Sequence, residues 1–253
     1  MMSRKRYIIA EGVSPGQRRA RLTGAEYHHL TDVMRATKGD QVALLDGDGG
    51  VYEAVIEKIT GNEALLEIIS HERVEKRSAA DMALAVIKAH RFDIAVEKCS
   101  ELGAGRIIPF SSTRSVWRGD EDRAERKRLR MERKVASACK QSGRPYFPVV
   151  MPVVDFDSLV EIASSYSRIY VADDAGCPPS KCPSASACGS VLGIVGPEGG
   201  FTKTELDRLI GLGAVPMSLS PCTLRAETAV ICLLYQLSIM MGEAGRDGGK
   251  TPR

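Results

Sequence analysis

The chain has 253 residues, of which 43% are hydrophobic and 26% are charged, and its formal net charge is only +3. This length suits two modest domains, and the small net charge excludes a polycationic protein, so any nucleic-acid surface must be local. No apolar run approaches a membrane span, and residues 1–10 are too short for a signal peptide. The seven cysteines include no CxxC pair, so we expect reduced thiols, a cytoplasmic protein and no metal site.

Residues 1–75 have the pattern of a small β-rich domain. Thr23 and Glu26 form a capping-box pattern that predicts a helix over 24–37. The turn sequence Asp46-Gly-Asp-Gly-Gly50 between two strand patterns is a strong hairpin signal. Short strands with tight turns at this spacing suggest a small barrel. The strands are expected, in chain order, at 7–10, 19–22, 41–45, 51–59 and 64–69.

The charged stretch 71–79 lacks periodicity and predicts a linker. Over 76–253, strands alternate with helices, which predicts a parallel sheet with helices on its faces. The last helix is apolar on nearly all sides and is expected to be buried. The strands are expected at 82–87, 106–110, 149–154, 169–172, 191–195 and 214–219. The helices are expected at 92–102, 120–141, 155–164, after the capping box of Thr202 and Glu205, and at 226–241.

Two tight loops follow two of these strands. Gly196-Pro-Glu-Gly-Gly200 comes after the strand 191–195, and Ser220-Pro-Cys-Thr-Leu-Arg225 comes after the strand 214–219. Each loop leads into a helix, and ligands of open α/β sheets bind at such strand ends. The glycine patterns of dinucleotide-binding and P-loop proteins are both absent, so a dinucleotide or nucleoside triphosphate role loses its main support.

The loop 196–200 and the run Leu224-Arg-Ala-Glu-Thr-Ala229 resemble motifs of the SPOUT class of RNA methyltransferases. The closer resemblance is to the family that methylates N3 of a uridine in small-subunit (16S) ribosomal RNA. Ser220 and Cys222 depart from that family's usual glycine and arginine. Further matches follow in the family's order along nearly the whole chain, at 28–30, 33–35, 38–40, 46–49, 97–103, 106–110, 113–115 and 141–144.

This resemblance implies an α/β protein with an N-terminal PUA-like β-barrel that binds RNA, over 1–75. It also implies a C-terminal SPOUT trefoil-knot methyltransferase domain over 76–253, with S-adenosylmethionine as cofactor. The expected partners are small-subunit rRNA or the assembled small ribosomal subunit, and a second copy of the chain in a homodimer. Two rival functions stay open: another SPOUT methyltransferase acting on ribose 2′-O, and a non-catalytic RNA-binding or ribosome-assembly protein.

S-adenosylmethionine needs an apolar slot, backbone donors and acceptors for the adenine edge, and a neutral or negative surface near its sulfonium. Glycines allow the backbone to come close to such a ligand, although the same glycines could simply make tight turns. The candidate cofactor-binding residues are Ala172, Asp173, Ile194, Gly196, Gly199, Gly200, Leu219, Ser220, Leu224 and Thr228.

Methylation of uracil N3 removes a weakly acidic proton, so a cation for the developing anion and a base are expected. Arg225 is the candidate cation, because its fixed fork suits a carbonyl oxygen or a phosphate. Glu227 or Glu198 is the candidate base. The alternative is that both carboxylates merely favour nearby helix N-termini.

The candidate RNA-binding residues are basic side chains beside family motifs or after an apolar helix stripe. For Arg35 and Lys38, the alternative is a solvated helix end. The candidates are Arg35, Lys38, Arg91, Arg114 and Arg144.

Overall fold

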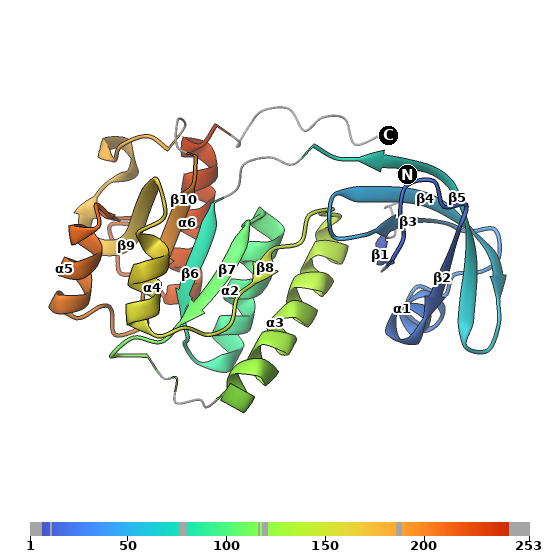
Figure 1. The fold of residues 1–253 in the computed structure, drawn as a ribbon, viewed down its shortest axis with the longest axis horizontal. Helices are drawn as coiled ribbons and strands as arrows, with labels where there is room; N and C mark the ends of the chain where they lie inside the picture. Colours follow the sequence, from blue (N-terminus) through green and yellow to red (C-terminus); the bar gives the residue numbers. More distant parts are fainter. Residues whose placement is uncertain are drawn as a thin grey trace. The chain divides into compact units, whose positions relative to one another are not determined.

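The computed structural model describes residues 7–10, 12–75, 80–115, 117, 121–185 and 189–242. The chain divides into two compact units (Figure 1). One unit takes residues 1–76 together with 136–147, and the other takes 77–135 and 148–253. The first unit therefore includes a segment, 136–147, that lies within the second domain expected from the sequence.

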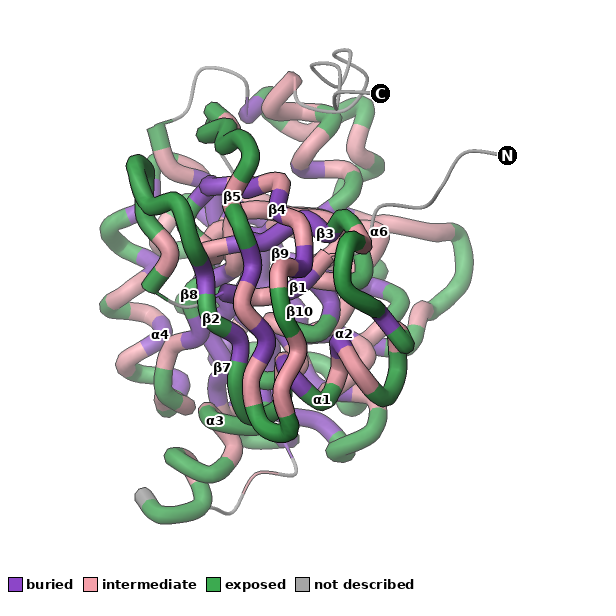
Figure 2. The backbone as a smooth tube through the Cα atoms, turned by 90° about the vertical axis from the view of Figure 1, so that its right-hand side faces the viewer, coloured by how far each residue is buried: buried purple, intermediate pink, exposed green. Residues whose placement is uncertain are grey.

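The first unit contains a five-stranded sheet in the order β1-β3-β4-β5-β2. Strand β1 runs parallel to β3, and the other neighbours are antiparallel. Along β4, buried residues alternate with half-buried ones because successive side chains point to opposite faces (Figure 2). The sheet confirms the expected β-rich, PUA-like fold class. Its strands are β1 Tyr7–Ile9, β2 Arg19–Thr23, β3 Gln41–Leu45, β4 Gly50–Ile59 and β5 Glu63–Arg73.

The predicted hairpin between β3 and β4 is confirmed. Asp46 Oδ1 accepts hydrogen bonds from the backbone amides of Asp48 and Gly50, both at 2.8 Å. Gly49 has a φ of 97°, and a Cβ there would lie 2.3 Å from the ring of Tyr146. Glycine is therefore required at this turn for both its backbone angle and its lack of a side chain.

The predicted helix over 24–37 is wrong in its length and its cap. Helix α1 spans Gly24–His28, a π-helical turn follows over His29–Val33, and the Thr23 side chain makes no capping hydrogen bond. Glu26 instead accepts hydrogen bonds from the Ile9 amide and from Lys140 Nζ. The capping box fails because these tertiary partners occupy the carboxylate. The helix ends early where Arg35 takes a left-handed φ of 51°.

The second unit contains a six-stranded sheet in the order β11-β9-β10-β6-β7-β8, with every neighbouring pair parallel. This arrangement confirms the predicted α/β class, while the trefoil knot stays a prediction. The strands are β6 Asp81–Ala85, β7 Arg106–Phe110, β8 Val149–Val150, β9 Arg168–Cys177, β10 Val191–Val195 and β11 Val215–Met217. The helices are α2 Ala89–Leu102, α3 Glu121–Ser142, α4 Phe156–Ala163, α5 Lys203–Gly211 and α6 Ala226–Met240, with a 3-10 turn, η2, at Pro179–Lys181.

Helices cover both faces of this sheet. Phe156 and Leu159 of α4 and Leu209 of α5 pack with strand residues in one core cluster. On the opposite face α6 approaches β10 closely, since a Cβ on Gly193 would lie 3.0 Å from Leu237 and 3.1 Å from Leu233. Helices α2 and α6 contact one another beside that face. In the described part of the chain, none of the helices combines the length and hydrophobicity of a membrane span.

Four predicted elements differ from the structure. Strand β5 runs to Arg73, so the start of the predicted linker is wrong; residues 76–79 lie outside the described residues. Strand β8 has two residues rather than six, and β9 continues to Cys177 because it pairs with β11 beyond the predicted end. Helix α6 is not buried all round, since Tyr235 is 54% exposed and Ile239 is 43% exposed.

The close packing of α6 on β10 predicts that Gly193→Val destabilises the protein by roughly 1–3 kcal/mol, as overpacking of a core does. The added methyls would meet Met82, Leu233 and Leu237. Gly211→Ala is the control, because nothing lies within 4 Å of a Cβ there, and it should be neutral or stabilising by up to about 1 kcal/mol. Urea unfolding of both variants measures the difference. Equal stability of the two variants would contradict this packing.

Candidate functional site

The carboxyl ends of the parallel strands bring three candidate cofactor segments to one edge of the sheet. Strand β10 pairs with β9 and β6, and β9 pairs with β11, all in parallel. The residues after Val171 of β9, where its ladder with β10 ends, and the segments that follow β10 and β11 therefore leave the sheet at the same edge, where α/β proteins bind ligands. These segments contain 172–173, 196–200 and 219–228.

The glycine loop, residues 196–200, makes a tight turn directly after β10. The Gly200 amide donates to the Pro197 carbonyl at 2.8 Å, and Gly200 has a φ of 67°. A Cβ on Gly196 would lie 2.8 Å from the ring of Phe201. That ring stacks on Phe110, with centroids 6.2 Å apart. The loop is thus anchored to the core at one end and carries bare backbone elsewhere.

Arg114, in the segment after β7, holds this loop. Its Nη1 donates to the carbonyl of Gly199 at 2.8 Å and to that of Phe201 at 3.4 Å. The sequence suggested an RNA contact for this exposed arginine. The structure places its guanidinium against the backbone of the glycine loop.

Glu205 joins the loop after β7 to the start of α5. Its carboxylate accepts hydrogen bonds from the amide and hydroxyl of Thr113 and from the amide and hydroxyl of Thr202. The bonds from Thr202 confirm the predicted capping box. Burial alone would raise the pKa of Glu205, but the four hydrogen bonds outweigh burial and hold its pKa below the usual value.

Strand β9 loops outward where it meets β11. Val171 lies opposite Pro216 and Cys177 lies opposite Met217, so residues 172–176 bulge out of the ladder. The Ser218 amide then donates to the Cys177 carbonyl at 2.9 Å and closes the end of the pair. Ala172 and Asp173 lie in this bulge, at the edge where the cofactor segments meet.

The loop after β11 is tied to the bulge and to itself. Thr223 Oγ1 donates to Asp174 Oδ2 at 2.7 Å. Within the loop, the Cys222 amide donates to Ser220 Oγ at 3.2 Å. Ser220, where the resembling family usually has glycine, therefore uses its hydroxyl to close its own turn.

Three charged side chains gather between α2, the glycine loop and α6. Arg91 is ion-paired with Glu198, and its Nε lies 3.7 Å from Glu227 Oε1. The other oxygen, Glu227 Oε2, is buried and has no hydrogen-bond partner among the described residues. A buried acceptor without a partner costs about 1–3 kcal/mol, so such a group often marks a place where a ligand supplies the donor.

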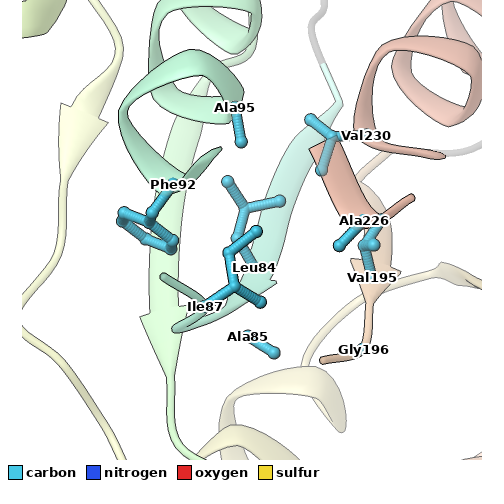
Figure 3. A pocket seen from close by; sticks show the side chains of 9 residues that line it. All are labelled: Leu84, Ala85, Ile87, Phe92, Ala95, Val195, Gly196, Ala226 and Val230. Atoms are coloured by element: carbon cyan, nitrogen blue, oxygen red, sulfur yellow. The ribbon is translucent and has the colours of Figure 1, made fainter. Parts of the chain in front are cut away.

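A small apolar pocket lies beside this cluster, between the ends of β6 and β10 and the helices α2 and α6 (Figure 3). Phe92 and Ala95 of α2 face Ala226 and Val230 of α6 across it. Arg91 directly precedes Phe92, and Glu227 directly follows Ala226. The ion pair therefore joins the same two helices that line the pocket.

The remaining candidates have different surroundings. Ile194 is fully buried in the core and supports the strand behind the loop. Asp173 Oδ1 accepts from the Ala175 amide, and Arg225 is exposed immediately before α6. Leu219 and Leu224 are half-buried and Thr228 is exposed. Three candidate RNA-binding residues belong to the first unit: Arg35, Lys38 and Arg144.

This edge suits a cationic nucleoside ligand such as S-adenosylmethionine. Half-buried apolar side chains of Ala172, Leu219 and Leu224 can flank a flat base. The bare backbone of the glycine loop offers donors and acceptors close by. The buried, unpartnered oxygen of Glu227 adds an acidic acceptor. Two contacts that shape this edge could not be predicted from the sequence, because the partners are distant in the chain. They are the ion pairs of Arg91 with Glu198 and Glu227, and the hydrogen bonds of Arg114 to the glycine loop.

Comparison with known families agrees with these features. Residues 74–238 match a family model described as an RNA methyltransferase domain, and residues 22–69 match an RNA methyltransferase PUA domain. These matches and the fold define the class as a methyltransferase that acts on RNA.

Relatives narrow the class further. Ribosomal RNA small subunit methyltransferase E of Bacillus subtilis is 30% identical over 235 residues, covering 88% of this chain and 92% of the relative. The protein of that name from Synechocystis is 31% identical over 225 residues, covering 87% and 73%. The chain belongs to the ribosomal RNA small subunit methyltransferase E family.

Solved structures of similar proteins contain the cofactor. A Legionella pneumophila methyltransferase in complex with S-adenosylmethionine superposes with a TM-score of 0.85 at 27% identity, covering 94% of this chain and 98% of that one. Ribosomal RNA small subunit methyltransferase E of Neisseria gonorrhoeae, bound to S-adenosylmethionine, has a TM-score of 0.81 at 25% identity, with the same coverage.

The hydrogen bonds of Glu205 predict that Glu205→Gln destabilises the protein by about 2–3 kcal/mol at pH 7, because an amide nitrogen would face backbone and hydroxyl donors. A lowered pKa gives stability that is present above the carboxyl's usual pKa. That stability is lost as the pH falls through its lower pKa in the folded state. Urea unfolding at pH 7 and at pH about 3 should therefore show a smaller difference from wild type at the acid pH. A difference that does not change with pH would contradict this role.

Proposed function

We propose that the protein transfers a methyl group from S-adenosylmethionine to N3 of a uridine in small-subunit (16S) ribosomal RNA. The observation that carries the proposal is the pairing of Arg91 with Glu198 and Glu227, which joins the glycine loop to the start of α6. Family membership supports the methyl transfer and the RNA class. The choice of N3 rests on the resemblance of the motifs to the uracil-N3 family.

The cofactor supplies an electrophilic methyl group when it is bound. The backbone of Gly196, Gly199 and Gly200 would hold the adenine edge, with Ala172, Leu219 and Leu224 against the ring. Ser220 and Thr228 would complete the loop and the first helical turn, with Ile194 behind them. The carboxylate of Asp173, in the bulge of β9, suits the cationic sulfonium.

Uracil N3 must lose its proton before it can attack a methyl group. Glu227 is the proposed proton acceptor, because its Oε2 is buried and has no partner within the described residues. Glu198 is the second candidate, but Arg91 already engages it closely. Arg225 is exposed at the start of α6, where its guanidinium can stabilise the negative charge that develops on a uracil carbonyl oxygen.

We also propose that small-subunit rRNA, free or in the assembled subunit, is held by basic residues, among them Arg35, Lys38 and Arg144 of the first unit. The match to a PUA domain supports RNA binding by the first unit. The protein is proposed to act in the cytoplasm as a homodimer. The exposed Tyr235 and Ile239 on α6 support a partner against that helix. The location is supported by the six cysteines among the described residues, which are all free thiols.

A methyl-transfer assay tests the proposed function. Wild-type protein, labelled S-adenosylmethionine and unmethylated small ribosomal subunits should yield 3-methyluridine, read by mass spectrometry of the rRNA nucleosides. Arg225→Ala should lower kcat by roughly 10²–10³-fold, as expected when a stabilising donor is removed from a developing anion. Arg208→Gln is the control, because Arg208 pairs with Asp157 and is none of the candidate site residues.

The outcomes separate the rival functions. A 2′-O-methylated ribose would keep the fold and move the protein to a sister reaction. Lack of product on subunits, free rRNA and tRNA, together with lack of cofactor binding in calorimetry, would leave an RNA-binding or assembly role.

The proposed base predicts that Glu227→Gln lowers kcat by roughly 10²–10⁴-fold, because the amide cannot take the proton. Glu198→Gln should have the smaller effect on kcat. Calorimetry should show cofactor binding by both variants, which separates a chemical defect from a binding defect. A larger loss of kcat in Glu198→Gln would reverse the two roles.

A further inference from the structure

We infer that Arg91 is a positioning residue of this reaction: it holds the carboxylate of Glu227 by one oxygen and leaves the other oxygen to accept the uracil proton. This inference rests on the proposed function. It also changes the role that the sequence suggested for Arg91, from a contact with RNA to a contact with the carboxylates of Glu198 and Glu227.

The first support is the geometry of the three side chains. Arg91 lies in the first turn of α2 and is ion-paired with Glu198 of the glycine loop, while its Nε lies 3.7 Å from Glu227 Oε1. The Arg91 side chain is only 32% exposed, and that of Glu227 is 12% exposed. A planar guanidinium presents donors in a fixed fork, so one arginine can hold two carboxylates at a set separation.

The second support is the balance of charge. Two carboxylates surround one guanidinium, so the cluster carries a net charge of about −1 when all three groups are ionised. An RNA phosphate would have to displace a carboxylate from Arg91 to bind there. A cationic methyl donor, in contrast, is attracted to such a cluster. The cluster is therefore poorly suited to bind a phosphate and well suited to lie near a cationic methyl donor.

The third support is the difference between the two oxygens of Glu227. Oε1 faces Arg91, whereas Oε2 is buried without a partner among the described residues. The backbone of Glu227 is fixed as well, since it lies in the first turn of α6, where the Ala229 amide donates to the Arg225 carbonyl at 2.8 Å. Arg91 thus sets the rotation of a carboxylate whose position is already determined by packing.

The proton step follows from this arrangement. The N3–H bond of uracil breaks, its proton bonds to Glu227 Oε2, and its electron pair stays on N3. That pair would form the bond to the methyl carbon, while the sulfur of the donor would leave with the pair of the broken S–C bond. Arg91 touches neither the uracil nor the proton. It acts through Glu227, whose carboxylate it turns into position before the substrate binds.

The test compares Arg91→Gln, Arg91→Lys and the control Arg208→Gln in steady-state methylation of small ribosomal subunits. Arg91→Gln should lower kcat by roughly 10²-fold, the size expected when a catalytic group is misplaced, with little change in the KM for subunits. Arg91→Lys should recover part of kcat, because it restores the charge but not the fork. The double variant Arg91→Gln/Glu227→Gln should be no slower than Glu227→Gln alone.

Hydrogen exchange gives a readout that does not need methyl transfer. In Arg91→Gln, without substrate, the amide of Gly200, in the loop that Arg91 ties through Glu198, should exchange faster than in wild type and in Arg208→Gln. The amide of Ala229, which the packed first turn of α6 holds, should not change. Thermal melting and circular dichroism confirm that each variant is folded. Unchanged exchange at Gly200 would overturn the inference whatever the wild type methylates.

The kinetic outcomes distinguish the inference from the proposed function. A raised KM for subunits that depends on salt, with unchanged kcat, would make Arg91 an RNA contact and overturn the inference while the function stands. Wild-type protein that yields no 3-methyluridine would overturn the function. The hydrogen-exchange result then decides whether Arg91 holds the glycine loop.

Discussion

The parallel pairing of β10 with strands on both of its sides is the constraint on which the rest of the second unit depends. All five residues of β10 are buried, and its neighbours are β9 and β6. Because parallel strands end at one edge, this pairing brings the bulge after Val171, the glycine loop and the first turn of α2 together. Gly193, in the middle of β10, lets α6 pack closely against the strand.

The arginines of this edge act mainly as internal ties. Arg114 holds the carbonyls of the glycine loop, and Arg91 holds two carboxylates. A guanidinium engaged in this way is less available to a phosphate. Arg225 is exposed at the start of α6 and forms no ion pair with another described residue, so its guanidinium can face a substrate. The edge therefore combines a binding surface for a cationic donor with an exposed cation, Arg225, that can face the base to be methylated.

Elements with a strong local signal could be predicted from the sequence. The strand 191–195, the strand 106–110 and the cap of Thr202 with Glu205 match the structure because nearby residues determine them. The similar pattern at Thr23 and Glu26 failed, since Lys140 and the Ile9 amide take the carboxylate instead. The partners of Arg91 and Arg114 could not be predicted, because only the order of the strands brings them together.

The departures of Ser220 and Cys222 from the resembling family can be judged on the same physical basis. A glycine in a tight loop is replaced at low cost when the new side chain fits the turn and satisfies a backbone donor. Ser220 meets this condition, because its hydroxyl accepts from the Cys222 amide. Cys222 is exposed, so its side chain is not needed to hold the loop, whereas Thr223 ties the loop to Asp174. The loop thus keeps a defined turn without the usual glycine, which favours a cofactor loop that has been retained over one that has been lost.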